Sequence, residues 1–354
     1  MVTSRAIIYS NYGDPLSEIK VHQYTISDPV DDEVLLQSVA APINPSDLIQ
    51  IAGIYPSRPP MDTSLGTKEP SAVAGNEGLF KIIKVGSKVK DFKIGDWCIP
   101  LHVNTGTWRT YSKTAEDQLI KIPKNYVSMA QATTVSVNGC TALQLLTTLT
   151  DVKPGEWVIQ NGSNSVVGKF VIQIAKKMGI KTLNVVRNRP NIEELKKKLY
   201  DLGATKVITE DENTSPEFES TIKEWTKGSI IKLGLNCIGG DSATGVVSKV
   251  SPEGVFVTYG AMILGPVKIP IHKLTFENVK CVGYWVTENA KKDINGKIKS
   301  VHEALKLMHD GVIGDIDVEE KVVHLDNLTD EEFLQIYKNA FTDSKKLKQL
   351  VVYK

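Results

Sequence analysis

The chain has 354 residues, more than the roughly 100–200 of an ordinary domain, so its length predicts two domains. Lys plus Arg number 42 and Asp plus Glu number 41, giving a net charge of +1. This balance argues against binding nucleic acid or a membrane surface through bulk charge. No apolar run approaches the roughly 18–20 residues of a membrane-spanning helix, and the first residues contain neither an apolar signal segment nor an Arg/Ser-rich leader. We therefore expect no membrane span and no secretory signal in this sequence.

Residues 1–125 consist of short apolar runs separated by Gly and Pro, which is typical of a small barrel-like β domain. Its strand-like runs are, in chain order, Ala6–Tyr9, Glu33–Val39, Leu79–Val85 and Ile94–Pro100. Between two of these runs lies the Pro- and Gly-rich segment 51–70, for which we expect irregular backbone. Long irregular segments in compact domains are often functional.

From residue 126 to 289, strands alternate with helices, which predicts an α/β fold with a doubly wound parallel sheet. Apolar residues from Val167 to Met178 recur at i, i+3, i+4 and i+7, so we expect a helix that ends at Gly179. A second helix is expected to end at Gly203. The expected strands are Glu156–Asn161, Lys181–Val186, Lys206–Thr209, Lys232–Cys237 and Gly254–Tyr259.

The chain after residue 290 is charged and predicted to be helical up to a final strand, Gln349–Tyr353. We expect that strand to return to the first domain, because chain termini often lie close together. The predicted division is therefore a β-rich domain of 1–125 and 290–354 around an inserted α/β domain of 126–289.

The segment Asn161–Gly168 joins the first strand of the α/β domain to its first helix. Such a loop presents backbone N–H groups and the positive end of a helix dipole to the pyrophosphate of a dinucleotide. Only Gly162 and Gly168 are glycine, so an ordinary strand-to-helix turn also fits this loop. The strand, helix and second strand around it favour a cofactor site.

The end of the second strand indicates which dinucleotide is bound. About 20 residues after the loop, NAD-binding domains carry an Asp or Glu that binds the ribose 2′-hydroxyl. Here Arg187, Asn188 and Arg189 follow the strand instead. Guanidinium groups bind phosphate bidentately, so this pair favours NADPH over NADH, and the alternative is a solvated basic turn.

Eight short motifs are spread over nearly the whole chain: Ile43–Asp47, Gly53–Ser57, Gly75–Gly78, Gly106–Trp108, Val135–Asn138, Leu235–Gly240, Tyr259–Met262 and Tyr284–Thr287. Together they resemble the medium-chain dehydrogenase/reductase superfamily, and within it the mitochondrial trans-2-enoyl thioester reductases. The Gly-x-Tyr-Pro-Ser element combined with Arg-x-Arg is the specific part. The resemblance implies a GroES-like barrel catalytic domain, a Rossmann-type cofactor domain, a homodimer and a place in the mitochondrial matrix.

The resemblance also implies which residues contact NADPH. These are Asn138, Asn164, Ser165, Val166, Val167, Arg187, Asn188, Arg189, Tyr259, Gly260, Ala261, Met262, Tyr284, Trp285, Val286 and Lys348. Without the resemblance, Asn138 would be a helix or turn cap and Lys348 a surface charge. Asn188 replaces the Asp that this family usually has between the arginines, and Ala261 replaces a second Gly.

Zinc-dependent alcohol dehydrogenases carry a Gly-His-Glu element where this chain has Gly75, Asn76 and Glu77, and they keep a catalytic cysteine near Asn44–Asp47, where this chain has none. The four cysteines are scattered, as Cys98, Cys140, Cys237 and Cys281, and form no Cys-x-x-Cys pair. A structural or catalytic zinc and a disulfide scaffold are therefore not expected, and neither is alcohol oxidation, which relies on that Lewis acid. Glu77 is expected to be a buried, hydrogen-bonded carboxylate.

Reduction of an enoyl thioester adds hydride at Cβ, develops negative charge on the thioester oxygen and takes a proton at Cα. Tyr55 is the candidate proton donor, because phenols ordinarily ionise near pH 10, and the resemblance implies the same role. By composition alone, a tyrosine that packs in a Pro-rich turn would be preferred. Trp108 and Trp285 either line an acyl channel or belong to the core.

The leading hypothesis is an NADPH-dependent reductase of enoyl-CoA or enoyl-acyl-carrier-protein in fatty-acid synthesis. One alternative is a quinone oxidoreductase of the same superfamily, which needs no proton donor to Cα, and another is a non-catalytic NADPH-binding protein. Relatives commonly pair edge strands of the cofactor sheet, so Val282–Val286 is the predicted dimer edge. An acidic carrier protein would meet a basic patch, for which Arg58, Lys345 and Lys346 are candidates.

Overall fold

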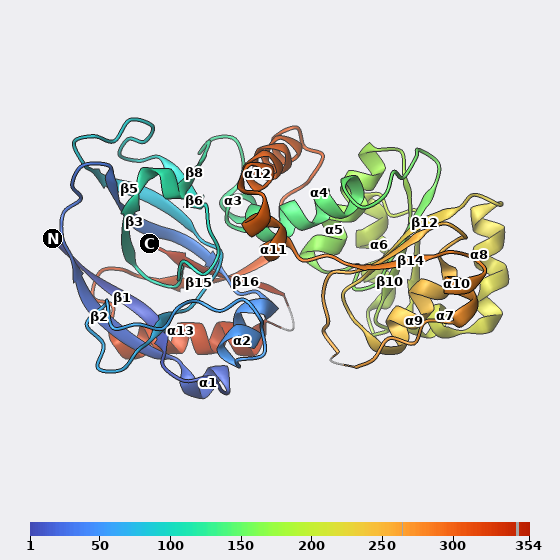
Figure 1. Cartoon of the computed structure of the whole chain (residues 1–354), viewed down its shortest axis with the longest axis horizontal. Coiled ribbons are helices and arrows are strands. Elements are labelled where there is room, and N and C mark those ends of the chain that lie inside the picture. Colours follow the sequence, from blue (N-terminus) through green and yellow to red (C-terminus); the bar gives the residue numbers. More distant parts are fainter. Residues whose placement is uncertain (264, 345–346) are drawn as a thin grey trace. The chain divides into compact units, whose positions relative to one another are not determined.

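The computed structural model describes residues 1–263, 265–344 and 347–354. The chain forms two compact units (Figure 1). The β-rich unit comprises Met1–Val137, Ala290–Leu305 and Asp315–Lys354, and the α/β unit comprises Asn138–Asn289 and Lys306–Gly314. The first unit extends beyond the expected residue 125 because Ala130 of helix α3 (Met129–Thr134) packs on the β-rich core.

The β-rich unit contains two sheets. The smaller has the strand order β2-β1-β4, and the larger, seven-stranded sheet has the order β15-β16-β3-β5-β6-β8, with β7 paired to β3. The strands are β1 Val2–Tyr9, β2 Lys20–Ile26, β3 Glu33–Pro42, β4 Ala72–Val73, β5 Leu79–Val85, β6 Trp97–Pro100, β7 Tyr111–Ala115, β8 Leu119–Ile122, β15 Val318–Val323 and β16 Lys348–Tyr353. The helices are α1 Pro15–Glu18, α2 Pro45–Ile51, α3, α11 Val286–Lys292, α12 Ile294–His309 and α13 Asp330–Asp343, of which α11 and α12 run across the unit boundaries.

The expected return of the last strand to the first domain is confirmed. Strand β16 pairs antiparallel with β3 and parallel with β15. Helix α13 packs against this pair and against β2, although β2 lies far away in sequence (Figure 1). The expectation of an entirely helical stretch before the last strand was wrong, because β15 lies within it. The sequence of β15, Val-Glu-Glu-Lys-Val-Val, is too charged to show the period of a half-buried strand.

The core of the β-rich unit determines the place of Trp108. Its ring is fully buried, with its centroid 5.0 Å from that of Tyr337 and 5.3 Å from that of Phe341. Tyr9 and Phe333 belong to the same apolar cluster. Of the two roles considered for Trp108, the structure therefore supports the core.

The α/β unit is built on a six-stranded parallel sheet with the order β11-β10-β9-β12-β13-β14. The chain goes from β9 to one side and then, from β12 onwards, to the other, so the topological switch lies between β9 and β12. The strands are β9 Trp157–Gln160, β10 Lys181–Val186, β11 Lys206–Thr209, β12 Ile231–Asn236, β13 Val255–Thr258 and β14 Lys280–Gly283. This confirms the predicted Rossmann-type α/β fold.

Helices flank this sheet (Figure 1). They are α4 Cys140–Thr147, α5 Val166–Lys177, α6 Ile192–Leu202, α7 Glu210–Thr214, α8 Glu219–Thr226, α9 Gly240–Lys249 and α10 Ile271–Thr275. The predicted ends of α5 and α6 are confirmed, since Gly179 and Gly203 both have positive φ. Among the described residues, no helix combines the length and the apolar character needed to cross a bilayer.

Candidate active site

Tyr55 lies in the loop that follows helix α2, as expected for the irregular segment. The backbone N–H groups of Ile54 and Tyr55 both donate to the carbonyl of Ile49, at 2.9 and 3.0 Å. Gly53 has φ +76°, and a Cβ there would meet the Tyr12 side chain at 2.7 Å, so the turn into the loop requires glycine. The segment 53–58, which we call the Tyr55 loop, is thus tied to the end of α2.

A cluster of polar side chains holds the other end of the Tyr55 loop. Gln50, in the last turn of α2, donates from Nε2 to the carbonyl of Ser57 at 2.7 Å and to Oδ1 of Asn104 at 2.9 Å. Asn104 Nδ2 and Lys291 Nζ both donate to the Ser57 hydroxyl at 3.0 Å. The bond from Gln50 to Ser57 is buried and so shielded from water, and the other three bonds are partly buried.

Asn76 joins this cluster to helix α2. Its Nδ2 donates to Asp47 Oδ1 at 2.8 Å and to Gln50 Oε1 at 3.0 Å, while its Oδ1 accepts from the backbone N–H of Asn104 at 3.1 Å. Asp47 and Gln50 lie three residues apart and therefore share one face of α2. Among the described residues, no three His, Cys, Asp or Glu side chains come together as a metal site requires.

Two buried carboxylates lie beside this cluster, Asp47 and Glu77. Burial raises the pKa of Asp47 to about 6, while hydrogen bonds from Asn76 and Asn44 and the charge of Lys348 act in the opposite direction. Burial also raises the pKa of Glu77, opposed by Lys348 and by hydrogen bonds from Asn44 and others. Glu77 accepts hydrogen bonds from the Asn44 side chain and from the backbone N–H of Val137, at 2.9 and 2.7 Å, which is the structural role expected of it.

Lys348, at the start of β16, lies in the β-rich unit. Its Nζ donates to the carbonyl of Ile43 at 3.1 Å and to the Asn44 side chain. Burial lowers the pKa of this ammonium, and Glu77 and Asp47 raise it. Lys348 thus neutralises buried carboxylates within its own unit, and its contact with the cofactor phosphate stays a prediction.

In the α/β unit, the predicted phosphate loop follows β9 and leads into α5. Ser165 caps the helix, accepting from the backbone N–H of Gly168 at 3.1 Å. Gly162 has φ +60°, and a Cβ there would meet Cys237 Sγ at 2.6 Å. Asn164, Val166 and Val167 are partly buried around this helix start. The loop therefore has the narrow, backbone-lined form that suits a phosphate.

Two more predicted segments meet the phosphate loop at the carboxyl ends of β12 and β13. The side chain of Asn161 donates to Asn236 Oδ1 at 2.8 Å, and its Oδ1 accepts from the backbone N–H of Cys237 at 2.8 Å. The backbone N–H groups of Tyr259 and Met262 donate to the carbonyls of Asn236 and Cys237, at 2.9 and 3.0 Å.

This folds Tyr259–Met262 onto the Leu235–Gly240 motif. Gly260 allows the close approach, since a Cβ there would lie 3.1 Å from Cys237 Cβ. Ala261 and Met262 are exposed, whereas burial raises the pKa of Tyr259. Both Asn161 and Asn236 are fully buried, so their amides fix this edge of the sheet.

The arginine pair lies at the carboxyl end of the neighbouring strand β10. Arg187 and Asn188 are exposed and Arg189 is partly buried, with its Nε making no hydrogen bond. The structure adds two carboxylates that the sequence reasoning missed, Glu210 and Asp211 at the start of α7. Asn188 donates to Asp211 Oδ2 at 3.2 Å. Parallel pairing of β10 with β11 brings them together, because the carboxyl ends of parallel strands meet at one edge.

Glu210 faces the positive charge of Arg187. Burial raises the pKa of this carboxyl, and a hydrogen bond from Ser242, a second from Asn213 and the charge of Arg187 lower it. Ser242 also accepts from the Asn161 side chain at 2.9 Å, so Glu210 is linked to the phosphate loop. The Thr-x-x-Glu capping box at Thr209 was the sequence signal for a helix here.

The remaining predicted cofactor residues occupy different places in the fold. Asn138 lies in a π-helical turn, Val135–Gly139, and its buried Oδ1 makes no hydrogen bond. Turns of this kind are frequent at functional sites. The Tyr284 hydroxyl donates to Gln144 Oε1 at 2.8 Å. Trp285 is partly buried and Val286 begins helix α11.

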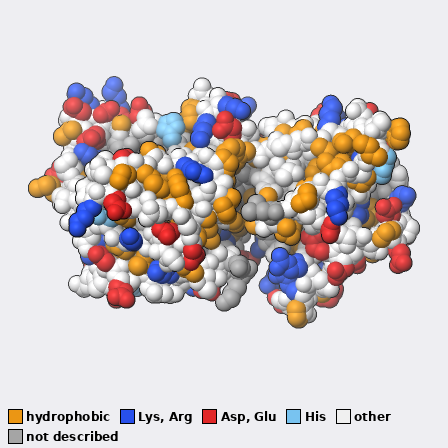
Figure 2. Space-filling model, turned by 60° about the horizontal axis from the view of Figure 1, so that its bottom comes forward, with side chains coloured by type: hydrophobic (Ala, Val, Ile, Leu, Met, Phe, Trp, Pro, Cys, Tyr) orange, Lys and Arg blue, Asp and Glu red, His pale blue; other side chains and the backbone are white. Residues whose placement is uncertain are grey.

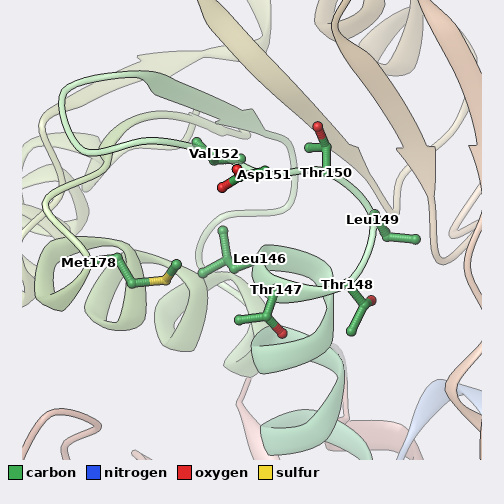
Figure 3. Close-up of a pocket in the computed structure, with 8 residues that line it drawn as sticks. All are labelled: Leu146, Thr147, Thr148, Leu149, Thr150, Asp151, Val152 and Met178. Carbon is green, nitrogen blue, oxygen red and sulfur yellow. The ribbon is translucent and has the colours of Figure 1, made fainter.

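A cavity of about 390 Å³ lies in the α/β unit (Figure 3). Its lining residues are Leu146, Thr147, Thr148, Leu149, Thr150, Asp151, Val152 and Met178. They precede β9 or end α5, so the cavity lies at the amino ends of the strands. Ligands of open α/β sheets bind at the carboxyl ends, where the predicted cofactor residues are. We therefore do not assign this cavity to the cofactor.

Comparison with known proteins covers the full chain. Two family models match, "Alcohol dehydrogenase GroES-like domain" over residues 30–124 and "Zinc-binding dehydrogenase" over residues 166–308. The chain is 40% identical to the mitochondrial enoyl-[acyl-carrier-protein] reductase 2 of Debaryomyces hansenii, over 100% of this chain and 94% of that protein. It is also 41% identical to an NADPH quinone oxidoreductase of Kluyveromyces marxianus, over 99% of this chain and 94% of that protein.

Solved structures give the same result. The mitochondrial 2-enoyl thioester reductase Etr1p/Etr2p heterodimer of Candida tropicalis matches with a TM-score of 0.96 and 40% identity over 100% of both chains. The complex of Etr1p with NADP and crotonyl-CoA matches with a TM-score of 0.95, at the same identity and coverage. The chain therefore belongs to the family of mitochondrial enoyl-[acyl-carrier-protein] reductases, within the medium-chain dehydrogenase/reductase superfamily.

Proposed function

We propose that the chain catalyses the NADPH-dependent reduction of trans-2-enoyl thioesters, carried by coenzyme A or acyl-carrier protein, to acyl thioesters in mitochondrial fatty-acid synthesis. The observation that carries this proposal is the 40% identity, over the full length of both chains, with Etr1p, whose structure holds NADP and crotonyl-CoA. The relatives named as mitochondrial enoyl-[acyl-carrier-protein] reductases support both the substrate class and the compartment.

The residues of the α/β unit fit NADPH. Ser165 and Val166 begin a helix whose N–H groups suit the pyrophosphate, and Arg187 with Arg189 suits a 2′-phosphate. The unpartnered Oδ1 of Asn138 is a buried acceptor that suits an amide or hydroxyl of the cofactor. Tyr259–Met262, Tyr284, Trp285 and Val286 are assigned to the nicotinamide side, and Lys348 to a phosphate, as predictions from the family.

When bound, NADPH supplies the hydride that is added to Cβ of the enoyl group. The chain's own contribution is to orient the thioester and to deliver a proton to Cα. Tyr55 is the proposed donor, through its phenolic O–H, because it lies in a loop that hydrogen bonds hold at both ends. Proton transfer of this kind typically accelerates a reaction about 10²–10⁴-fold.

The test is a nicotinamide-absorbance assay with NADPH and a short trans-2-enoyl-CoA, with NADH and a quinone as controls. We expect oxidation of NADPH with the enoyl substrate. Replacement of Tyr55 by Phe should lower kcat about 100-fold or more while leaving the Kd of NADPH nearly unchanged. A Tyr55→Phe variant with wild-type kcat would show that Tyr55 is not the proton donor.

Quinone reduction is the second candidate, and the relative from Kluyveromyces marxianus favours it. A quinone accepts hydride without a proton donor at Cα, so Tyr55→Phe should leave quinone turnover intact. Reduction of the quinone without reduction of the enoyl substrate would favour this candidate. NADPH binding with neither activity would favour the non-catalytic alternative.

A homodimer through the edge of the α/β sheet completes the proposal. Every residue of β14 is exposed, and the adjacent Ile271, Leu274 and Phe276 are also exposed, with Phe276 at 83%. Figure 2 shows hydrophobic side chains gathered on the surface of this unit. The predicted edge, Val282–Val286, is corrected to Lys280–Gly283, because Val286 already belongs to α11.

Of the residues considered for a carrier-protein patch, Arg58 is exposed and 345–346 lie outside the described residues.

A further inference from the structure

The side chains of Gln50, Asn76 and Asn104 form a continuous set of hydrogen bonds that we call the amide lock. Both amide hydrogens of Asn76 are used, one on Asp47 and one on Gln50. Both amide hydrogens of Gln50 are used as well, one on the carbonyl of Ser57 and one on Asn104. The lock therefore connects helix α2 to the Tyr55 loop without a gap.

Groups of fixed polarity set the direction of every amide in the lock. The Asp47 carboxylate only accepts, so it turns the NH₂ group of Asn76 toward itself. The backbone N–H of Asn104 only donates, so it requires the oxygen of Asn76. Gln50 must then accept from Asn76 and donate to the carbonyl of Ser57, which only accepts.

The far end of the lock is fixed in the same way. Asn104 receives a hydrogen bond at Oδ1 from Gln50, so its NH₂ group faces Ser57 Oγ. The Lys291 ammonium, which only donates, occupies a second acceptor position of the same hydroxyl. Asn104 has φ +62°, a conformation that Asn tolerates better than most residues. If any amide in the lock were turned around, a donor would face a donor or an acceptor would face an acceptor.

We propose that the amide lock, directed by Asp47, is a positioning device that holds the Tyr55 loop so that the Tyr55 hydroxyl reaches Cα of the substrate. This inference rests on the proposed function, since it assigns to Gln50 an effect that acts through Tyr55. A proton donor must lie within hydrogen-bond reach of its target, and a displacement of about 1 Å can cost about 100-fold in rate.

The test uses Gln50→Glu, which keeps the size of the side chain but replaces the NH₂ group with an acceptor. The new oxygen would face two acceptors, the carbonyl of Ser57 and Oδ1 of Asn104, and so release the loop. Asn104→Gly keeps the positive φ, removes the side chain that bonds Gln50 and Ser57 Oγ, and serves as a second variant. Gln335→Glu makes the same chemical change on an exposed face of α13 and serves as the control.

Each substitution is made in the wild-type protein and in the Tyr55→Phe variant, and kcat, the Kd of NADPH and the unfolding temperature are measured. In the wild-type background we expect Gln50→Glu to lower kcat about tenfold or more. In the Tyr55→Phe background we expect a change within about twofold, because two substitutions that remove the same contribution do not add. The Kd of NADPH should stay within about twofold in both, and Gln335→Glu should change nothing.

Three results would overturn the inference. A folded Gln50→Glu variant with wild-type kcat would show that the lock does not position the donor. An equal loss of kcat in both backgrounds would assign Gln50 a structural role that does not act through Tyr55. If Gln50→Glu does not fold, Asn104→Gly decides by the same criteria. If Tyr55→Phe itself keeps wild-type kcat, both the proposed role of Tyr55 and this inference are refuted. If Tyr55→Phe is defective but Gln50→Glu keeps wild-type kcat, only this inference is refuted.

Discussion

The buried carboxylate of Asp47 should make the stability of the β-rich unit depend on pH with an unusual sign. In the folded chain, burial raises the pKa of this carboxyl from 3.8 to about 6. Between these two values the folded state holds a proton that the unfolded state has lost. Stability therefore falls as pH rises through this window, whereas a salt-bridged carboxylate gives the opposite slope.

The size of the effect follows from the same two values. Each pKa unit corresponds to about 1.4 kcal/mol, so ionised Asp47 costs the folded state about 3 kcal/mol at pH 7 relative to its protonated form. Asp47→Asn removes the titration and keeps the shape of the side chain. At pH 4 the unfolded carboxyl is already partly ionised, so the unfolding free energy of Asp47→Asn minus that of the wild type should increase by about 2 kcal/mol between pH 4 and pH 7.

The measurement is urea unfolding of both proteins at several pH values from 4 to 8, at constant ionic strength. Any lost hydrogen bond in Asp47→Asn shifts the difference by an amount that does not depend on pH, so the slope isolates the titration. Asp28→Asn is the control. The hydrogen bond from Lys84 lowers the pKa of the exposed Asp28 carboxyl, so its difference curve should have the opposite sign. A flat difference curve for Asp47→Asn would refute the assignment of a buried, proton-holding carboxyl.

Three further predictions concern the α/β unit. Replacing Arg187 and Arg189 with Ala should weaken the binding of NADPH about 100-fold, because two charge-assisted contacts are lost, and the binding of NADH by less than about threefold. Equal losses of affinity in titrations with both cofactors would contradict the 2′-phosphate role. Gly162→Ala should lower the free energy of unfolding by about 1–3 kcal/mol, since its φ is +60° and the new Cβ would meet Cys237 Sγ at 2.6 Å, and an unchanged thermal transition would speak against this strain. If the proposed dimer forms through β14, Val282→Asp should convert it to a monomer in light scattering, and a dimer that persists would place the interface elsewhere.

The elements of the fold follow from local patterns, and most of them could be predicted. Strands β5, β10 and β11 have the expected bounds, because their apolar runs are interrupted at both ends by polar residues or by Gly. Strand β15 was missed because its sequence is charged. It forms by pairing with β16, and this pairing depends on the tertiary structure. The alternation of strands and helices predicted the doubly wound sheet, and the structure placed its switch in strand order at β9.

The site was predicted less completely, for a physical reason. Residues such as Tyr55, Arg187 and Ser165 belong to contiguous motifs, so the sequence displays them. The side chains around them come from segments far apart in the chain, as when Asn104 and Lys291 meet at Ser57, two residues from Tyr55. Glu210 likewise faces Arg187 only because β10 and β11 are parallel neighbours. No local pattern encodes such meetings.

Asn76 shows how one residue changes the chemistry of a shared fold. By its resemblance to zinc-dependent alcohol dehydrogenases, it stands where those enzymes have a histidine, and a metal ligand must offer a free electron pair. The amide nitrogen of Asn76 offers none, since both of its hydrogens donate, to Asp47 and to Gln50, and its oxygen accepts from the backbone N–H of Asn104. Asn76 therefore orients Gln50 in this chain, and through Gln50 it orients the Tyr55 loop. If the proposed role of Tyr55 is correct, residue 76 helps to hold a proton donor in this chain, where a histidine in a zinc-dependent enzyme would hold a metal.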